Sequence, residues 1–151
     1  MSFATALRRA PGRIAAGAFI LNSGLTKLRE NDEEHAKMLH GSAAAAYPVV
    51  KDMEPRTFVK LLGAGETALG ATLLLPSVPA GLAGLGLSGF SGALLGFYWR
   101  TPGMHEATDP RPTQHGTAFA KDVWMFGIGA GLVIDVLTNR RRKPKPKPTR
   151  A

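Results

Sequence analysis

The stretch LLGAGETALGATLLLP, residues 61–76, is apolar and rich in glycine, and it carries a single acidic residue, Glu66, near its middle. The chain beyond Glu66 continues without charge, since the segment 67–99 contains no Asp, Glu, Lys, Arg or His. Such a segment is too long for one ordinary membrane span, because a bilayer core requires only about 20 residues of helix. The segment therefore predicts two spans in succession.

The turn between these two spans is marked by PSVP, residues 76–79. Proline ends a helix because it lacks a backbone N–H and its ring clashes with the preceding turn. We therefore expect a hairpin of two membrane helices at about 56–75 and 80–99, each close to the length that a bilayer requires. Two flanking segments, about 9–28 and 122–138, are the remaining candidates for spans.

The first flanking span reaches membrane length only if Arg9, Arg13 and Lys27 extend their side chains to the interfaces. With it, the sequence predicts an all-α membrane protein, a four-transmembrane-helix bundle over residues 1–139. The mean hydropathy of the whole chain is close to zero, which a soluble helical protein would also show. The frequent glycines favour lipid instead, because glycine weakens helices in water and is common in membrane helices.

The charge distribution predicts the orientation in the membrane. The formal net charge is +8, and the basic residues gather near the two ends of the chain. Because cytoplasmic segments are enriched in Lys and Arg, we expect a multi-pass protein with both termini in the cytoplasm. Trp99 and Trp124 then fall at the same outer interface, where indole rings are favoured. In the first outer loop, Asn31 and Glu34 resemble a capping box and predict a short helix at about 32–45.

The two remaining loop regions are predicted to lack regular structure. The second outer loop, 100–120, contains several prolines, and the tail 140–151 alternates Lys with Pro and is expected to be extended and disordered in the cytoplasm. A polybasic tail beside a membrane is attracted to anionic lipid by about 1 kcal/mol per basic residue. It acts either as an orientation anchor or in partner recognition. Its membrane-surface residues are Arg140, Arg141, Arg142 and Lys143.

The composition excludes several chemistries. The chain has no cysteine, which removes disulfides, thiolate nucleophiles and Cys-ligated clusters or zinc. The four histidines form no HExxH pattern, so we expect no metal site. The basic residues lie at the ends rather than across a folded face, so nucleic acid is not an expected partner. The sequence offers no catalytic motif, and we expect no catalytic activity from this chain alone.

Glycines recur at helical spacing in all of the predicted spans. Two glycines four residues apart lie on one helix face and allow a second backbone to come close. The predicted helix-packing positions are Gly17, Gly24, Gly70, Gly92, Gly96, Gly127 and Gly131. One interpretation is tight packing inside the bundle. The other is an interface with a second copy of the chain, as a homo-oligomer, or with a partner membrane protein.

Glu66 lies about ten residues from either end of its span, and hence about 15 Å deep at ~1.5 Å per residue. An isolated carboxylate at that depth is costly, so it should face the bundle interior and be protonated or paired. Lys27 lies about 21 Å above Arg13, which leaves it within a side chain's reach of Glu66. Asn22, in the same span as Lys27, is placed to add a hydrogen bond.

The pair of Lys27 and Glu66 has two interpretations. In the structural one, it fixes the register of the first two spans and has no chemistry. In the functional one, Glu66 exchanges protons or orients a ligand beside a cavity for a quinone or another lipid-soluble molecule, since acids inside the membrane are commonly functional. Asp135, near the cytoplasmic end of the last span, predicts a separate ion pair with arginines nearby.

The chain resembles the DoxX family of small four-helix membrane proteins in three places. RIAAGAFILNSGLTKL, residues 13–28, is similar to the family's arginine, glycine and G-x-x-K-L pattern. GAGETALGATLLLP, residues 63–76, resembles its E-x-x-x-G-x-x-L pattern, with Glu66 as the acid. HGTAFAKDVWMFGIGAGLVID, residues 115–135, is like the phenylalanine and lysine that lead into a glycine-bearing last helix. The long outer loop and the Lys-Pro tail go beyond the family's compact core.

This resemblance implies a cellular setting. DoxX proteins are associated with oxidoreductase systems at the bacterial cytoplasmic membrane, including a thiosulfate:quinone oxidoreductase subunit and a complex linked to oxidative-stress defence. The implied function is an integral membrane subunit or scaffold of such a system, in contact with quinone, membrane lipid and other membrane proteins. A non-enzymatic docking scaffold and a small-solute or proton pathway through Glu66 are the alternatives.

Overall fold

The computed structural model describes residues 3–106, 109–120 and 122–141, and most of these residues are helical, which confirms the predicted all-α class. A short antiparallel hairpin of two strands occupies part of the loop that the sequence predicts to be irregular. The elements are α1 (Phe3–Arg29), α2 (Glu33–Ala46), the 3-10 turn η1 (Pro48–Val50), α3 (Pro55–Leu74), α4 (Ala80–Arg100), β1 (His105–Glu106), β2 (Asp109–Pro112), α5 (Thr117–Ala120) and α6 (Asp122–Arg141).

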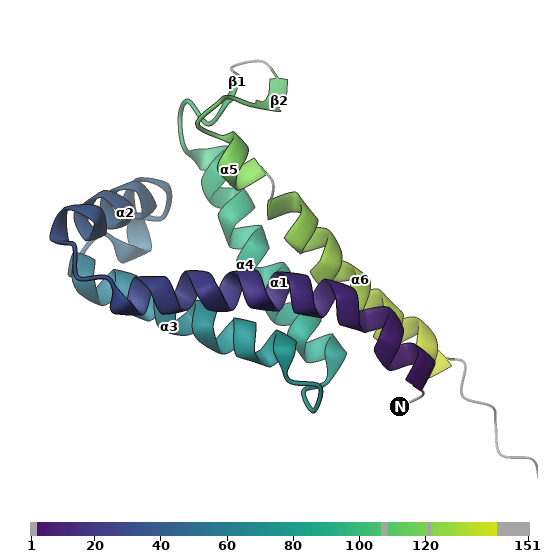
Figure 1. Cartoon of the computed structure of the whole chain (residues 1–151). Coiled ribbons are helices and arrows are strands. Elements are labelled where there is room, and N and C mark those ends of the chain that lie inside the picture. Colours follow the sequence, from purple (N-terminus) through teal and green to yellow (C-terminus); the bar gives the residue numbers. More distant parts are fainter. Residues whose placement is uncertain (1–2, 107–108, 121, 142–151) are drawn as a thin grey trace, which may run out of the picture.

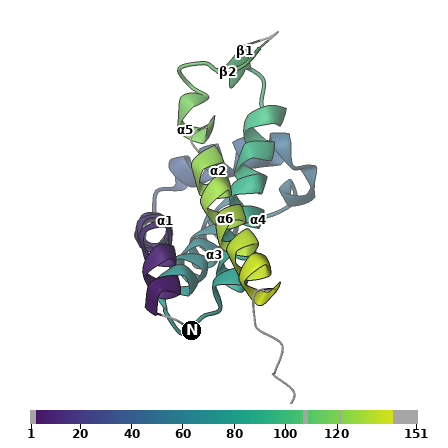
Figure 2. The ribbon, with the colours of Figure 1, turned by 90° about the vertical axis from the view of Figure 1, so that its right-hand side faces the viewer.

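The four long helices form two antiparallel pairs (Figure 1). α1 packs along α3, and α4 packs along α6, whereas the contacts between the two pairs are fewer. The pairs approach each other near the start of α1 and the end of α6 and diverge from there, so that α2 and the β1–β2 hairpin lie apart (Figures 1 and 2). The arrangement is therefore two coupled helix pairs rather than a uniform four-helix bundle.

The helix ends lie close to those predicted around the central turn and farther from them at the chain ends. α3 ends at Leu74, and α4 begins at Ala80 with Pro79 as its N-cap. α1 begins at Phe3, well before the predicted start at 9, and α6 continues to Arg141, beyond the predicted end at 138. Arg140 and Arg141 therefore belong to the last helix, while the rest of the predicted tail lies outside the described residues.

The core lies where the two pairs meet. Ile20 of α1, Leu73 of α3 and Leu87 of α4 are fully buried, and Leu132 of α6 packs with them. The rest of this cluster is alanine, at positions 16, 80 and 83. Small side chains at these positions allow the helix backbones of both pairs to approach the same point.

The short helix α2 follows α1 and lies at the end of the α1–α3 pair that is away from the termini (Figure 1). It is capped by Asp32, whose carboxylate accepts hydrogen bonds from the backbone N–H groups of Glu34 and His35, so the cap is not the predicted Asn31. α2 packs on α3. Just after it, the Tyr47 hydroxyl donates a hydrogen bond to the carbonyl oxygen of Ala93 in α4, at 2.7 Å. This contact joins the outer end of one pair to the middle of the other.

In the described part of the chain, α4 is the single helix that is both long and apolar enough to cross a membrane by length and composition alone. The other long helices carry charged residues, such as Arg13 in α1, Glu66 in α3 and Asp135 in α6. Helix composition therefore supports one candidate span and leaves the predicted four-span bundle unconfirmed.

Candidate functional site

The backbones of α1 and α3 touch along a line of glycines. A Cβ added at Gly24 would lie 2.5 Å from the backbone nitrogen of Thr67 and 2.6 Å from the carbonyl oxygen of Gly63. One at Gly70 would lie 2.6 Å from the backbone nitrogen of Leu21. Atoms cannot approach so closely, so only glycine fits at these positions. Two of the predicted packing glycines, Gly24 and Gly70, therefore make one continuous helix contact from opposite sides.

Gly17 lies farther along the same contact. A Cβ there would lie 2.9 Å from the Leu74 side chain and 3.0 Å from that of Leu73. The nearest atoms, Leu74 Cγ and Leu73 Cβ, lie close to the backbone of α3, so this end of the contact is also tight, although its distances are longer than the 2.5 and 2.6 Å at Gly24. The α1–α3 contact is therefore tightest near the middle of α3, where the acid lies.

The acid of α3 is paired with the lysine of α1 in the middle of this contact. Lys27 Nζ lies 2.9 Å from Glu66 Oε2, and the side chains are 19% and 7% exposed, respectively. Lys27 Nζ also donates a hydrogen bond to Ser23 Oγ at 2.8 Å, one helical turn earlier. Ser23, which the sequence reasoning missed, is thus a second partner of the ammonium. The only signal for it was its spacing of four residues from Lys27 on the same helix face.

Asn22 does not join this group. Its side chain is not among the partners of Lys27, the residue is exposed, and its backbone carbonyl accepts a hydrogen bond from the Thr26 hydroxyl at 2.9 Å. Successive residues in a helix are about 100° apart, so the rotation that brings both Ser23 and Gly24 toward α3 turns Asn22 away from it. The helix is rotated so that Leu21, Ser23 and Gly24 face α3, which turns Asn22 outward.

The remaining predicted packing glycines have different surroundings. A Cβ at Gly92 would meet Phe126 at an ordinary 3.8 Å, and Gly96 lies against the Tyr47 hydroxyl. Gly127 and Gly131 are exposed, and within the described part of the chain a Cβ at either would meet no atom within 4 Å, so neither packs against another described element. The α4–α6 contact is made instead by glycines 84 and 129, since a Cβ at the former would lie 2.7 Å from the carbonyl oxygen of the latter.

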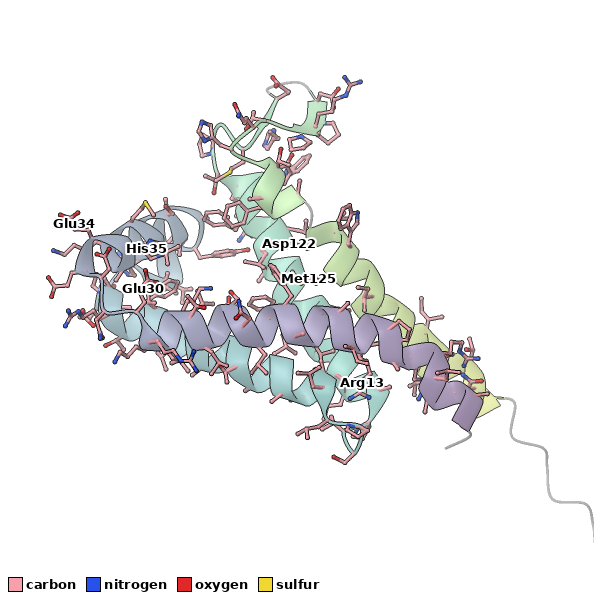
Figure 3. All side chains as sticks on the ribbon, viewed as in Figure 1. Arg13, Glu30, Glu34, His35, Asp122 and Met125 are labelled. Carbon is pink, nitrogen blue, oxygen red and sulfur yellow. The ribbon has the colours of Figure 1, made fainter. Side chains whose placement is uncertain are left out.

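Arg13 closes the end of α3 rather than reaching an interface. Its guanidinium donates hydrogen bonds to the carbonyl oxygens of Leu73, Thr72, Leu75 and Val78, at 2.7, 3.0, 2.7 and 3.1 Å. The last carbonyl groups of a helix have no partner within the helix, so a cation there satisfies them and complements the helix dipole. Arg13 is buried beside the α3–α4 turn (Figure 3). The predicted extension of its side chain to an interface is wrong.

A second ionic contact joins α1 to α6 near the ends of the chain. Arg9 Nε donates a hydrogen bond to Asp135 Oδ2 at 2.6 Å, and Arg8 pairs with the other carboxylate oxygen of Asp135. Arg9 is buried, whereas the Arg8 side chain is 57% exposed. The arginines that pair with Asp135 thus come from the first helix. The predicted tail residues contribute no described side chain, because those of Arg140 and Arg141 are not described and Arg142 and Lys143 lie outside the described residues.

The chemistry available at the α1–α3 contact is limited to charge and hydrogen bonding. Glu66 and Lys27 neutralise each other, and the glycine contact around them fixes which residues face one another. Within the described residues, no group of three or more His, Cys, Asp or Glu side chains is arranged to hold a metal ion. Comparison with known proteins finds no matching protein-family model, curated protein or solved structure.

Proposed function

We propose that the chain is an integral membrane protein in which α1, α3, α4 and α6 cross the bilayer and which serves as a subunit or scaffold of a membrane oxidoreductase system. The observation that carries the membrane placement is an inverted distribution of side chains. Four charged residues on the long helices, Arg9, Arg13, Glu66 and Asp122, are buried. The exposed ones lie toward the helix ends: Arg8, Arg29, Arg56, Lys60 and Arg100. Exposed large apolar side chains occur on the same helices: Leu7, Ile14, Phe19, Leu61, Leu82, Leu85, Trp99, Val123, Trp124, Phe126, Ile134 and Leu137.

The most apolar helix supports the same placement. Only 33% of the apolar window of α4 is buried inside the protein. A core helix of a soluble protein would be mostly covered by its own chain, because exposed apolar surface in water costs about 25 cal/mol per Å². Lipid supplies the missing cover for α4. Lipid also covers the exposed apolar side chains of α1, α3 and α6.

The aromatic residues at one end of the α4–α6 pair fit a membrane interface. Trp99 at the end of α4 and Trp124 at the start of α6 are 61% and 74% exposed. Indole rings favour the boundary between headgroups and hydrocarbon. We assign this end to the outer face of a bacterial cytoplasmic membrane and both termini to the cytoplasm, in keeping with the excess of Lys and Arg at the chain ends.

The redox association rests on the DoxX resemblance and on the residues that carry it. Arg13, Gly24, Lys27, Glu66 and Gly70, all part of that resemblance, gather in the α1–α3 contact or at its end. We propose that this pair of helices is the rigid element on which a redox partner docks, and that quinone reaches the partner from the bilayer. The electrons are carried by the partner, because the chain has no cysteine or other redox-active motif.

The membrane topology can be tested with cysteine labelling, because the natural chain has no cysteine. Single cysteines at Lys51, in the first outer loop, and at Ser77, in the α3–α4 turn, would be treated with a membrane-impermeant maleimide. We expect Lys51→Cys to react in intact cells and Ser77→Cys to react only after permeabilisation. Equal reaction of both in intact cells would contradict the proposed topology.

The redox association is tested by purification from the native host in mild detergent. We expect oxidoreductase subunits and quinone to co-purify with the chain. Glu66→Gln and Lys27→Met should lower the associated quinone-dependent activity by more than they lower the amount of accumulated chain, and Lys51→Met, at an exposed loop position, is the matched control. If activity falls only in proportion to protein level, the pair acts as a structural contact. If no oxidoreductase co-purifies, the redox proposal fails.

A docking scaffold without redox association is the second candidate, and the exposed glycines of α6 favour it. Gly127 and Gly131 lie four residues apart on an uncovered face, which suits close packing of another membrane helix. Gly127→Leu should then abolish recovery of a partner, as should deletion of residues 140–151 if the tail contributes. Unchanged recovery in both variants would eliminate this candidate.

A further inference from the structure

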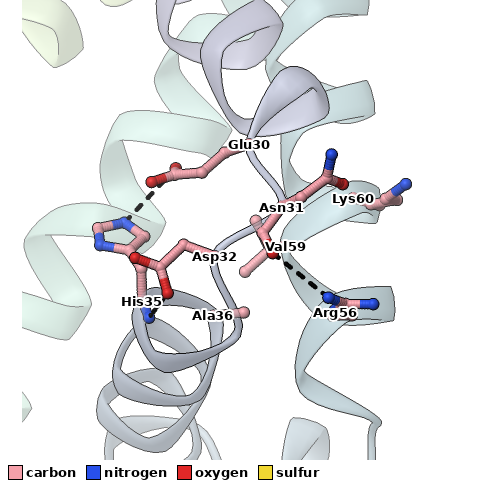
Figure 4. A pocket seen from close by; sticks show the side chains of 8 residues that line it. All are labelled: Glu30, Asn31, Asp32, His35, Ala36, Arg56, Val59 and Lys60. Carbon is pink, nitrogen blue, oxygen red and sulfur yellow. Dashed lines mark hydrogen bonds and ion pairs between the residues drawn. The ribbon is translucent and has the colours of Figure 1, made fainter.

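A small polar cleft of about 70 Å³ opens between the α1–α2 connection and the first turns of α3 (Figure 4). It lies at the end of the α1–α3 contact away from the termini, and it is separate from the buried pair of Lys27 and Glu66. The proposed function assigns no role to it. Its carboxylate side chains and its Arg and Lys side chains come from opposite walls, and His35 lies beside Glu30 on the acidic wall.

The acidic wall comes from the α1–α2 connection. Glu30 and Asp32 both line the cleft. Asp32 is held by the backbone N–H groups of Glu34 and His35, at 2.9 and 3.2 Å, and Glu30 Oε2 lies 3.8 Å from His35 Nε2. These contacts use only part of each carboxylate's capacity, since an ionised carboxylate accepts up to about four hydrogen bonds.

The basic wall comes from α3. Arg56 and Lys60 are four residues apart and therefore lie on one face of the helix. Arg56 Nη2 lies 3.3 Å from the carbonyl oxygen of Asn31 and 3.3 Å from Glu33 Oε1. These two contacts orient the guanidinium across the cleft from Asp32 (Figure 4). The remaining donors of the guanidinium stay available for a ligand oxygen.

The floor of the cleft is apolar. Ala36 of α2 and Val59 of α3 line it, and they are 4% and 5% exposed. A ligand with a charged group at each end and a short hydrocarbon link between them would place each charge beside the wall of opposite sign and the link beside Ala36 and Val59. An inorganic anion would face Glu30 and Asp32 at close range, and a simple cation would face Arg56 and Lys60.

We propose that this cleft binds a compact zwitterion in which a primary ammonium and a phosphate are joined by two carbons, as in a phosphoethanolamine group. The phosphate binds Arg56 and Lys60, because a guanidinium can contact two phosphate oxygens at once. The ammonium binds Glu30 and Asp32, and the two carbons lie on Ala36 and Val59. The ligand is either the headgroup of phosphatidylethanolamine or a free phosphoethanolamine, since both present the same groups.

The lipid source depends on the proposed membrane placement, whereas recognition of the zwitterion does not. If α1 and α3 cross the bilayer, the cleft lies at their outer end, at the depth of the lipid headgroups. A bound headgroup would then join the outer end of α1 to α2 and α3. The two sources can be separated by offering the ligand in two forms to the same full-length protein.

The experiment uses the full chain purified in detergent and measures binding of free O-phosphoethanolamine by isothermal titration calorimetry. A parallel arm uses nanodiscs of phosphatidylcholine with increasing phosphatidylethanolamine and detects the retained lipid by mass spectrometry. We expect Arg56→Gln and Glu30→Gln each to weaken binding by about tenfold, the effect of losing one charge-assisted contact. Lys51→Gln and Glu34→Gln, which make the same charge changes outside the cleft, should leave binding unchanged.

The acidic variants separate the proposal from a simple anion site. For an anion, removal of the charge of Glu30 or Asp32 would strengthen binding, whereas for the zwitterion it weakens binding. Asp32→Asn keeps an oxygen acceptor for the α2 cap, so it tests the charge without unfolding the helix. The proposal is overturned if neither form binds, or if Glu30→Gln binds phosphoethanolamine as tightly as the natural chain or more tightly. Binding in one arm only supports the site and identifies its source.

Discussion

The α1–α3 pair and the α4–α6 pair both bring two helix backbones together through glycine, but they differ in what surrounds that contact. Between α1 and α3, the glycines are accompanied by the buried pair of Lys27 and Glu66 and by Arg13 at the end of α3. Between α4 and α6, Gly84 and Gly129 meet each other's backbone, Ser88, Leu132 and Val133, and none of these nearest neighbours is charged. The first contact combines close backbone approach with an ion pair, and the second combines close backbone approach with uncharged neighbours.

This difference indicates which pair has a fixed register. In the proposed membrane setting, apolar contacts are weakly directional, because lipid tails solvate apolar side chains as well as a neighbouring helix does. An ion pair flanked by backbone contacts has one low-energy register, since a slip by one residue would leave Glu66 without its partner. The α1–α3 pair is therefore the more rigid unit and the more sensitive to single substitutions. The fluorescence of Trp99 and Trp124 reports on the other pair, because the chain has no further tryptophan.

The largest expected effect comes from Gly24→Leu. The position of its Cβ would overlap backbone atoms of both Thr67 and Gly63, and backbone atoms cannot move aside without separating the helices. We expect destabilisation of at least about 3 kcal/mol. Thermal unfolding in detergent, followed by circular dichroism, should show early loss of part of the helical signal. Tryptophan emission should keep its natural transition, because the α4–α6 pair does not depend on this contact.

The matched control for this substitution is Gly65→Leu. Gly65 lies on the exposed face of α3, and a Cβ there would meet nothing within 4 Å. We expect this variant to be as stable as the natural chain. A simultaneous loss of helix and tryptophan signals in Gly24→Leu would show that the two pairs unfold as one unit. It would contradict the expectation that the α4–α6 pair is stable without the α1–α3 contact.

The second prediction concerns the ion pair. Lys27→Met leaves the carboxylate of Glu66 buried without its cation, and loss of one partner of a buried pair costs about 3 kcal/mol. Lys27→Met combined with Glu66→Leu removes both charges and should recover most of that stability. Unfolding midpoints of the natural chain, Lys27→Met, Glu66→Leu and the double variant form a double-mutant cycle. A double variant no more stable than Lys27→Met would show that the pair is not what couples these two positions.

The third prediction applies the same reasoning to the other pair. Gly129→Ala would place a methyl group 2.8 Å from the backbone nitrogen of Ser88 and 2.9 Å from the carbonyl oxygen of Gly84. We expect a loss of about 1–2 kcal/mol, seen mainly in tryptophan emission. Gly127→Ala, on the uncovered face of the same helix, should be neutral or slightly stabilising, since alanine favours helix by about 0.5–1 kcal/mol. Equal losses in both variants would indicate that the exposed face is also packed in solution.

Local features of this fold can be predicted from the sequence. Prolines mark the α3–α4 turn because their effect on a helix is local, and the helical rise is sufficient to bring Lys27 within reach of Glu66. Which face of a helix packs against its neighbour is harder to predict. The run GIGAG in α6 has glycines on two faces, and the sequence does not say whether Gly129 or the pair Gly127 and Gly131 meets α4. In α1, the rotation of the helix about its axis likewise decides whether Ser23 or Asn22 lies beside Lys27 and Glu66.

The role of Arg13 could not be predicted for a related reason. A lone arginine near a helix end is expected to reach solvent or headgroups, since burial of an unpaired cation is costly. Its actual partners are backbone carbonyl groups at the end of α3, which become available only after α1 and α3 have packed. Backbone acceptors leave no mark in the sequence. Tertiary packing therefore determines where this cation lies.

The smallest predicted effect concerns the first turns of α3 and α4, one helix from each pair. α3 is capped by Glu54, whose carboxylate accepts hydrogen bonds from the backbone N–H groups of Arg56 and Thr57 at 3.0 and 2.6 Å, and these bonds hold its pKa below its ordinary value. α4 begins after Pro79, whose side chain makes no hydrogen bond to the first backbone N–H groups of the helix. The folded chain thus binds the proton of Glu54 less readily than the unfolded chain. The cap contributes fully above the ordinary pKa and is lost as the pH falls through the lowered one.

Acidification should therefore loosen the first turn of α3 and leave that of α4 unchanged. Amide hydrogen exchange between pH 6 and about pH 3, corrected for the intrinsic rate, should show falling protection at Arg56 and Thr57 but not at Leu82 and Ala83. Glu54→Gln keeps an oxygen acceptor but does not titrate, so its protection should not change with pH. If the natural chain and Glu54→Gln lose protection alike, the acid response arises elsewhere, and the starts of α3 and α4 do not differ in the way their caps indicate.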